Sequence, residues 1–470
     1  MKTFLFLLKN ELKLNIGKTK FIIAFVLVAL MFLFNALFFS IKFSDEIKDF
    51  ELSQEENNSL IKNYSKNLAN LTLVSQKIYL KPDPIYILSK PQSSQLPDYA
   101  SMNLYNFKFP LYSKQNIYSL IKQESFDAVF IITIIMTLLA LILSYDAFII
   151  ESSNKNQQIL YSFKIKKAHQ LLAKYLSIII LLSLVLGFGL IIDMGFVIFY
   201  KYFQDIFLWK LIITYFISLI FLSIFTLLGL YLSLIIKKSY ISIILLVFIW
   251  SVLVILIPAS EKALAGIFYP IPSQYKVQKK IKQMQDNVWN KRSLTPDEKL
   301  GIDDEEDCNK EYARKRAKLS MDLDRIGFEM KKKQATDKIN QILSVKDKLT
   351  FSPVVMFKNI IEKISNTGIY KFDNFFNEFI GYYNKYSDFI IKEDLKDPAS
   401  KHLFSEENAW ANVCMSKLPL DPNKLPRFPY QAPGLLGAVL NVMDKILILI
   451  FINGILLLLC FRKMKAYKPI

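Results

Sequence analysis

Long apolar runs with few or no charged residues recur along the chain, and this pattern limits the possible folds more than any other. A helix needs about 20 apolar residues to cross roughly 30 Å of hydrocarbon, because lipid offers no partner to an unpaired backbone N–H or C=O. Six segments meet or approach that length: 21–41, 128–145, 175–199, 211–236, 240–260 and 434–461. The last is interrupted by Asp444 and Lys445. We therefore predict an all-α membrane protein with six transmembrane helices.

The composition agrees with a membrane protein and excludes several other classes. Apolar residues make up 53% of the chain, and the mean hydropathy is +0.28. Two histidines and three cysteines are too few for a conventional metal cage or a small disulfide scaffold. The net charge of +18 raises the question of nucleic-acid binding. The lysines follow the connections between spans, however, so we expect no nucleic-acid partner.

The short connections indicate which way the chain crosses the membrane. Lysine and arginine resist translocation and therefore mark cytoplasmic connections. They gather before the first span, between the second and third, between the fourth and fifth, and after the last: Lys2, Lys9, Lys13, Lys18, Lys20, Lys164, Lys166, Lys167, Lys174, Lys237, Lys238, Arg462, Lys463, Lys465 and Lys468. Both termini are therefore predicted to be cytoplasmic, with 462–470 as a tail. Residues 1–20 group their apolar side chains on one face, which predicts a helix in the membrane interface.

Two long segments, 42–127 and 261–433, fall outside the membrane in this topology and are predicted to form largely helical extracytoplasmic domains. The first is expected to begin as a polar helix that continues the first span. Between about 309 and 348 apolar residues recur at intervals of three and four, as in a helix. One unbroken helix there would reach about 60 Å and pair with a shorter helix at 273–291. Two or three shorter helices packed on one another are the alternative.

Aromatic residues recur at helical spacing between 375 and 389. This pattern indicates either a domain core or a surface that faces a partner, with a site for an aromatic ligand as the alternative.

The sequence carries none of the motifs of common catalytic sites. It has no G-x-x-x-x-G-K-[ST] phosphate loop and no H-E-x-x-H, C-x-x-C or G-x-S-x-G motif. We therefore expect no catalysis, no cofactor and no metal in this chain. The acidic run 303–307 is interpreted as a solvated turn, because it lacks the alternation and the glycine of a calcium loop.

Two features leave alternatives open. Cys308 and Cys414 both fall outside the membrane, where a disulfide persists, but the spacing alone does not decide whether they pair. Asp193 lies inside the third span. It marks either a proton or substrate path, or a structural residue that reaches the interface or pairs with Lys210 or Lys445.

The connection 146–174 is the one cytoplasmic segment long enough to engage a partner. Its sequence, DAFIIESSNKNQQILYSFKIKKAHQLLAK, resembles the loop between the second and third spans of ABC-2-type transporter permeases. In that family a Glu precedes a short Leu-rich coupling helix that ends in Ser. A basic residue follows, and then a Lys that opens the next span. The matching residues here are Glu151, Leu160, Ser162, Lys167 and Lys174. The chain departs from the pattern where Lys155-Asn156 replaces Gly-Thr and Lys164 replaces Pro.

Other segments resemble the branch of this family that has large outer loops. The helix at 1–20 is similar to the family's elbow helix, and six spans with both termini inside is its usual topology. Three motifs of the outer domain follow in the same order: Ser352-Pro353, Thr367-Gly368 and Leu425-Pro426-Arg427-Phe428. The resemblance covers nearly the whole chain and rests on the order and spacing of these motifs.

The resemblance implies a permease subunit of an ABC transporter in the cytoplasmic membrane of a bacterium. Such a subunit binds a separate ATPase and a second copy or a relative, giving twelve spans that move a substrate by alternating access. Leu160, Tyr161 and Phe163 would insert into a groove of the ATPase, with lysines at its rim. Two alternatives stay open. One is a mechanotransmission subunit that acts on an extracytoplasmic protein without transport, and the other is a membrane scaffold with no energy coupling.

Overall fold

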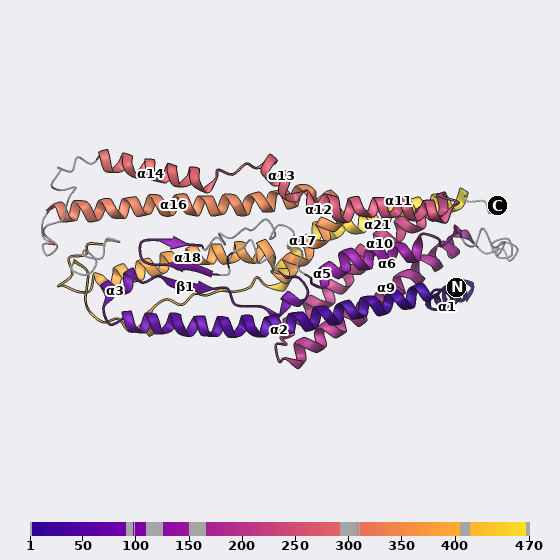
Figure 1. Cartoon of the computed structure of the whole chain (residues 1–470), viewed down its shortest axis with the longest axis horizontal. Coiled ribbons are helices and arrows are strands. Elements are labelled where there is room, and N and C mark those ends of the chain that lie inside the picture. The colour runs from indigo at the N-terminus through magenta and orange to yellow at the C-terminus, as the bar shows by residue number, and fades with distance from the viewer. Residues whose placement is uncertain are drawn as a thin grey trace.

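The molecule is elongated, with an apolar helical bundle at one end and a polar extension at the other (Figure 1). The computed structural model describes residues 2–90, 97, 99–109, 126–149, 166–291, 308, 311–404 and 414–466. The first helix, α1 (Lys2–Ile16), lies at the same tip of the bundle as the end of the last helix, α21 (Met443–Ala466) (Figure 1).

Five helices of the described part are long and apolar enough to cross a membrane. They are α2 (Thr19–Tyr64), α9 (Lys167–Phe199), α10 (Asp205–Ile235), the continuous helix α11–η3–α12 (Ser239–Ala259) and α21. A shorter apolar helix, α5–η2–α6 (Ala128–Ser144), coincides with the second predicted span. The prediction of a mostly helical membrane protein is confirmed.

Two of these apolar helices contain a π-helical segment, in which the backbone hydrogen bonds widen by one residue. One is η2 (Ile131–Met136), between α5 (Ala128–Phe130) and α6 (Thr137–Ser144). The other is η3 (Ser251–Leu256), between α11 (Ser239–Trp250) and α12 (Ile257–Ala259). Segments of this kind are rare and are found frequently at functional sites. The Nε1 atom of Trp250 donates a hydrogen bond to the Oγ1 atom of Thr137 at 2.8 Å, which joins the two helices beside these segments.

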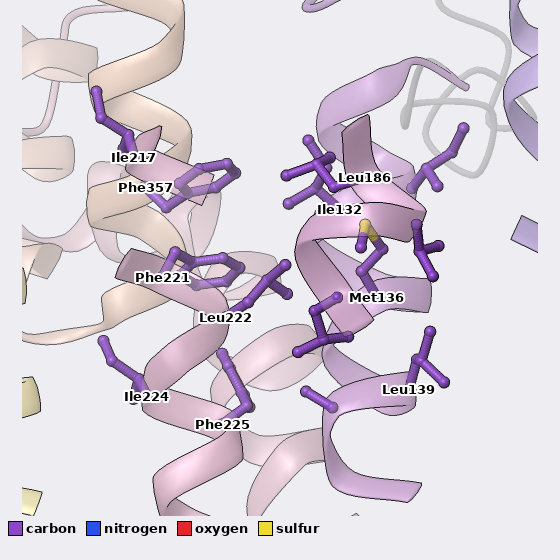
Figure 2. Packing of buried hydrophobic residues seen from close by; sticks show 14 of the residues in the cluster. Ile132, Met136, Leu139, Leu186, Ile217, Phe221, Leu222, Ile224, Phe225 and Phe357 are labelled. Atoms are coloured by element: carbon purple, nitrogen blue, oxygen red, sulfur yellow. The ribbon is translucent and has the colours of Figure 1, made fainter. Parts of the chain in front are cut away.

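The bundle packs around α10, which contacts α6, α9 and α21. Phe221 and Leu222 of α10 face Ile132 and Met136 of the second apolar helix across a closed core (Figure 2). All four side chains are fully buried.

Two glycines permit the closest approaches between helices in this bundle. A Cβ atom at Gly229 of α10 would lie 1.8 Å from the Oγ atom of Ser144. One at Gly189 of α9 would lie 2.2 Å from the ring of Phe32. Such contacts are possible only without a side chain, so both positions require glycine for packing.

A helix from the predicted second outer domain also joins the bundle core. This helix is α17 (Pro353–Ser365), and its first turn follows the Ser-Pro motif of the sequence: the Ser352 Oγ atom accepts the Val355 N–H at 3.5 Å. Phe357 stacks on Phe221 of α10, with 4.4 Å between ring centroids and an interplanar angle of 12° (Figure 2). The outer region is therefore packed directly onto the bundle.

Helix α2 passes from the bundle into the polar extension without a break. Its 46 residues span about 69 Å at 1.5 Å per residue. This confirms the prediction that a polar helix continues the first apolar span.

The extension contains a three-stranded antiparallel sheet that the sequence analysis did not predict. Its strands are β1 (Gln76–Tyr79), β2 (Tyr99–Met102) and β3 (Phe107–Lys108), in the order β1-β2-β3. Gln76 lies opposite Met102, and Ser101 lies opposite Lys108.

Helix α18 (Gly368–Asp394) packs on this sheet, and the ring of Phe107 contacts those of Phe379 and Tyr383. The aromatic residues that the sequence analysis noticed in this helix thus form the core of the extension, and Phe375, Phe379 and Tyr386 are fully buried.

Two long polar helices run side by side along the extension (Figure 1). They are α14 (Gln274–Lys291) and α16 (Glu311–Lys348), and the Gln285 Nε2 atom of α14 donates to the Leu323 carbonyl of α16 at 3.1 Å. Helix α16 is one continuous helix of 38 residues. The structure therefore supports the long helical hairpin over the alternative of several shorter helices.

The remaining elements are short and connect these parts. They are α3 (Leu68–Leu73), α13 (Glu261–Phe268), α20 (Leu435–Leu440) and the 3-10 turns η1 (Pro84–Ile87), η4 (Leu349–Phe351) and η5 (Pro422–Lys424). A proline-rich strap, residues 418–433, leads from the extension to α20. The pairing that the sequence left open is present: Cys308 and Cys414 form a disulfide, with their Cα atoms 5.6 Å apart.

Candidate functional site

The candidate site lies at the tip of the bundle where α1 crosses α9. Leu7 of α1 is buried, whereas Leu5, Phe6 and Leu14 are exposed. A helix that buries one apolar contact in the protein and exposes others suits the boundary between lipid and water, as the sequence predicted. Helix α1 therefore packs on the bundle through one side and leaves apolar side chains exposed on another.

A nearly buried ion pair joins α1 to α9. The Lys174 Nζ atom lies 2.9 Å from the Glu11 Oε1 atom, and the two side chains are 5% and 16% exposed. The same ammonium group lies over the ring of Phe148, 5.5 Å from its centroid. Because Lys174 lies in α9, the helix that follows the long connection, this pair holds that helix against the first helix.

A second ion pair holds the start of the same connection. The Lys20 Nζ atom, in the first turn of α2, lies 2.8 Å from the Asp146 Oδ2 atom, whose side chain is only 4% exposed. Asp146 lies two residues after α6, so the start of the connection and the helix that follows it are both bound to residues near the start of the chain.

Polar contacts fill the joint between α1 and α2. The Lys18 Nζ atom donates to the Asn15 Oδ1 atom at 2.7 Å, and the Asn15 Nδ2 atom donates to the Ser177 Oγ atom of α9 at 3.2 Å. Burial lowers the pKa of Lys18, while the nearby Asp146 carboxylate acts in the opposite direction. The joint is therefore a hydrogen-bonded polar cluster within an otherwise apolar bundle.

The structure places two of the six residues predicted for coupling. Lys167 is the first residue of α9, and its Nζ atom donates to the Lys465 carbonyl of α21 at 3.3 Å. Lys174 lies about two turns further along α9. Glu151, Leu160, Tyr161 and Phe163 lie outside the described residues.

The sequence analysis missed the partners of these lysines. Glu11, Asp146 and Asn15 were not named as site residues, although Glu11 carries a signal as the single acidic residue among the first twenty. An acidic side chain in an otherwise basic helix is expected where it pairs with a buried cation.

Asp193 in α9 is fully buried and belongs to a different polar contact. The Asn35 Nδ2 atom of α2 lies 3.2 Å and 3.4 Å from its two carboxylate oxygens, and also 3.1 Å from the Ile87 carbonyl. Asp193 is therefore enclosed by protein and hydrogen-bonded to α2.

The two lysines suggested as partners of Asp193 are engaged elsewhere, so that alternative is wrong. The Lys210 Nζ atom donates to the Ser365 carbonyl at 3.2 Å, and the Lys445 Nζ atom pairs with the Asp347 Oδ1 atom at 2.8 Å. Asp193 instead joins α9 to α2 through an amide.

Within the described residues, no cluster of three or more His, Cys, Asp or Glu side chains is arranged to hold a metal ion.

A family model described as ABC-2 family transporter protein matches residues 5–377, from the first turns of α1 to the middle of α18. No curated protein matches the sequence.

Proposed function

Because this chain belongs to the ABC-2 family of transporter proteins, we propose that it is the membrane subunit of a transporter driven by a separate ABC ATPase. The ATPase docks at the tip of the bundle that holds α1 and the end of α21. The subunit crosses the cytoplasmic membrane of a bacterium six times, with both termini in the cytoplasm. The five long apolar helices, the shorter helix Ala128–Ser144 and the lysines near this tip support the topology.

The observation that carries the proposal is that ion pairs hold the start of the connection between α6 and α9 and the helix α9 that follows it. Asp146 is bound to Lys20 of α2, and Lys174 is bound to Glu11 of α1. A force on the connection therefore acts on the first two helices as well as on α9. Since packed helices shift as near-rigid bodies, this arrangement suits the transfer of movement from an ATPase to the bundle.

In this proposal the apolar centre of the connection contacts the ATPase. Leu160, Tyr161 and Phe163 insert into its groove, and Glu151 and Lys167 lie at the borders of the contact. Lys174 lies further along the chain, in α9, and binds that helix to α1.

The test is co-purification of the ATPase with variants of the connection. Leu160→Asp and Tyr161→Asp are expected to lose most of the bound ATPase and of its stimulated hydrolysis, because a carboxylate is costly in an apolar groove. Asn154→Asp adds the same charge to the same connection and serves as the control. Retention of the ATPase and of activity by both Asp variants would instead favour a membrane scaffold without energy coupling.

A second copy of the subunit, or a relative, completes a twelve-span assembly in our proposal. The apolar windows of α21 and α11–α12 are only 17% and 22% buried within one copy, compared with 61% for α10. The helices at the edge thus have surface for a partner subunit as well as for lipid. Cross-linking of single cysteines on α11 and α21 in native membranes tests this assembly.

One observation favours a second candidate function, mechanotransmission to an extracytoplasmic protein. Helix α2 carries the Lys20 contact at one end and forms part of the polar extension at the other, without a break between them. Movement at the cytoplasmic tip is therefore passed outward along one element. Reconstitution of the subunit with its ATPase in vesicles separates the two functions, because only transport gives ATP-dependent movement of solute across the bilayer.

A further inference from the structure

The polar extension contains a groove of about 870 Å³ that the transport proposal does not use. One wall is the outer half of α2, from Phe50 to Lys62, and the floor is β1. The opposite wall is the proline-rich strap, which includes the Leu425–Phe428 motif. The groove thus lies between two segments that both continue into the bundle.

The charge of the groove has one sign. Lys62, Lys77, Lys81 and Arg427 line it and are exposed. Among the described residues that line the groove none is acidic, and none of these four side chains forms an ion pair with any other described residue. Four unpaired cations around one concave surface create a positive potential that attracts an anionic ligand.

The uncharged polar residues of the groove suit a peptide backbone. Gln54 and Asn58 on α2 and Asn423 on the strap carry amide groups, which both donate and accept hydrogen bonds. A peptide backbone offers the same two kinds of group at every residue. The wall from Phe50 to Lys62 covers about 18 Å along α2, which matches about five residues of an extended chain.

The aromatic residues of the groove fit a sugar less well. Phe428 stacks on Tyr430 at an interplanar angle of 18°, and its edge contacts Tyr382. Tyr79 packs on Tyr99 with 5.1 Å between ring centroids. These rings pack on one another, so they offer less open flat surface for a sugar ring to stack on.

We propose that this groove binds an extended acidic segment of an extracytoplasmic protein. Its carboxylates pair with Lys62, Lys77, Lys81 and Arg427, and its backbone bonds to the amide side chains. Arg427 is the central residue, because a guanidinium binds a carboxylate through two parallel hydrogen bonds. Binding is measured directly, so this inference holds or fails independently of ATPase coupling.

The test uses the full chain in lipid nanodiscs and a fluorescein-labelled peptide of alternating glutamate and glycine, followed by fluorescence anisotropy. Binding is expected to weaken strongly between about 0.05 M and 0.5 M NaCl, as salt screens exposed charges. The double variant K77E/R427E is expected to weaken binding at least about tenfold, since it places two like charges against the ligand. Lys385→Glu changes an exposed lysine of α18 outside the groove and is expected to leave binding within about twofold.

Each other result overturns the inference. A second labelled peptide, of alternating glutamine and glycine, tests the role of charge. If it binds as tightly as the glutamate peptide, the groove does not select charge. If a polygalacturonate oligomer binds tighter than the glutamate peptide, the ligand is a glycan and not a protein. If the glutamate peptide binds K77E/R427E and K385E alike, it binds elsewhere on this basic chain.

An unchanged unfolding temperature of K77E/R427E shows that a loss of binding is not a loss of fold.

Discussion

The Lys174 Nζ atom lies 2.9 Å from the Glu11 Oε1 atom, so the helix that follows the long connection is held by the helix that opens the chain. The two residues are 163 positions apart in sequence. Both are mostly shielded from water, which makes the loss of either one costly.

The first prediction concerns this pair. Glu11→Gln is expected to destabilise the protein by about 1–3 kcal/mol, because the nearly buried Lys174 ammonium loses the charge of the Glu11 carboxylate. ATP hydrolysis in the complex is expected to persist while its coupling to transport falls. Lys13→Gln alters an exposed lysine of the same helix and is the matched control. The charge swap E11K/K174E should recover part of the loss, and equal stability of Glu11→Gln and the wild type would refute the role of the pair.

A second prediction tests the packing of α10 against the second apolar helix. Gly229→Ala brings a methyl group into the space of the Ser144 side chain and should cost about 1–3 kcal/mol through overpacking. Gly195→Ala on α9 has no heavy atom within 4 Å of the new Cβ atom and should be neutral or slightly stabilising. Thermal unfolding in detergent measures both. Similar unfolding temperatures of the two variants would show that α10 and α6 are packed less closely.

The hydrogen bond between Trp250 and Thr137 gives a third prediction. Thr137→Val keeps the shape of the side chain but leaves the buried indole N–H without an acceptor, which costs about 1–3 kcal/mol. Thr137→Ser retains the hydroxyl group and is expected to stay close to the wild type. The unfolding temperature and the tryptophan emission of the two variants distinguish them. If the valine variant matches the serine variant, the bond contributes little.

The fourth prediction concerns the disulfide. It closes a loop with a sequence separation of 106, and its removal is expected to lower stability by about 2–4 kcal/mol. Cys414→Ser should therefore unfold at a lower temperature than the wild type, and reducing agent should lower the unfolding temperature of the wild type but not that of the variant. Cys460→Ser removes the buried free cysteine of α21 and should not change the response to reductant. If reductant leaves the unfolding temperature of the wild type unchanged, the bridge is absent or adds no stability.

Much of the fold follows from local patterns that a sequence displays. The intervals between Leu319, Leu323 and Ile326 indicate α16, and the Ser352-Pro353 pair marks the start of α17 because serine caps a helix and proline fits its first turn. The apolar runs locate the helices of the bundle, since lipid requires them to be long and uncharged.

The missed features depend on partners that are distant in sequence. Strand β3 has two residues and the other strands have four, which is too short for an alternating pattern to be recognised. Asp193 has an amide partner on α2, and only the packing of α9 on α2 brings Asn35 to it. The partner of Lys174 likewise comes from the crossing of two helices. The sequence therefore singled out Lys167, Lys174 and Asp193 but not the residues that they contact.

The unbroken course of α2 has a geometric consequence. From Ile41, where the apolar segment ends, to Tyr64, its last residue, the helix continues for about 35 Å. Over that length, a tilt of about 5° about Ile41 would displace Tyr64 by about 3 Å. A small rotation of α2 at the bundle thus corresponds to a displacement of about one hydrogen-bond length at the far end of the helix.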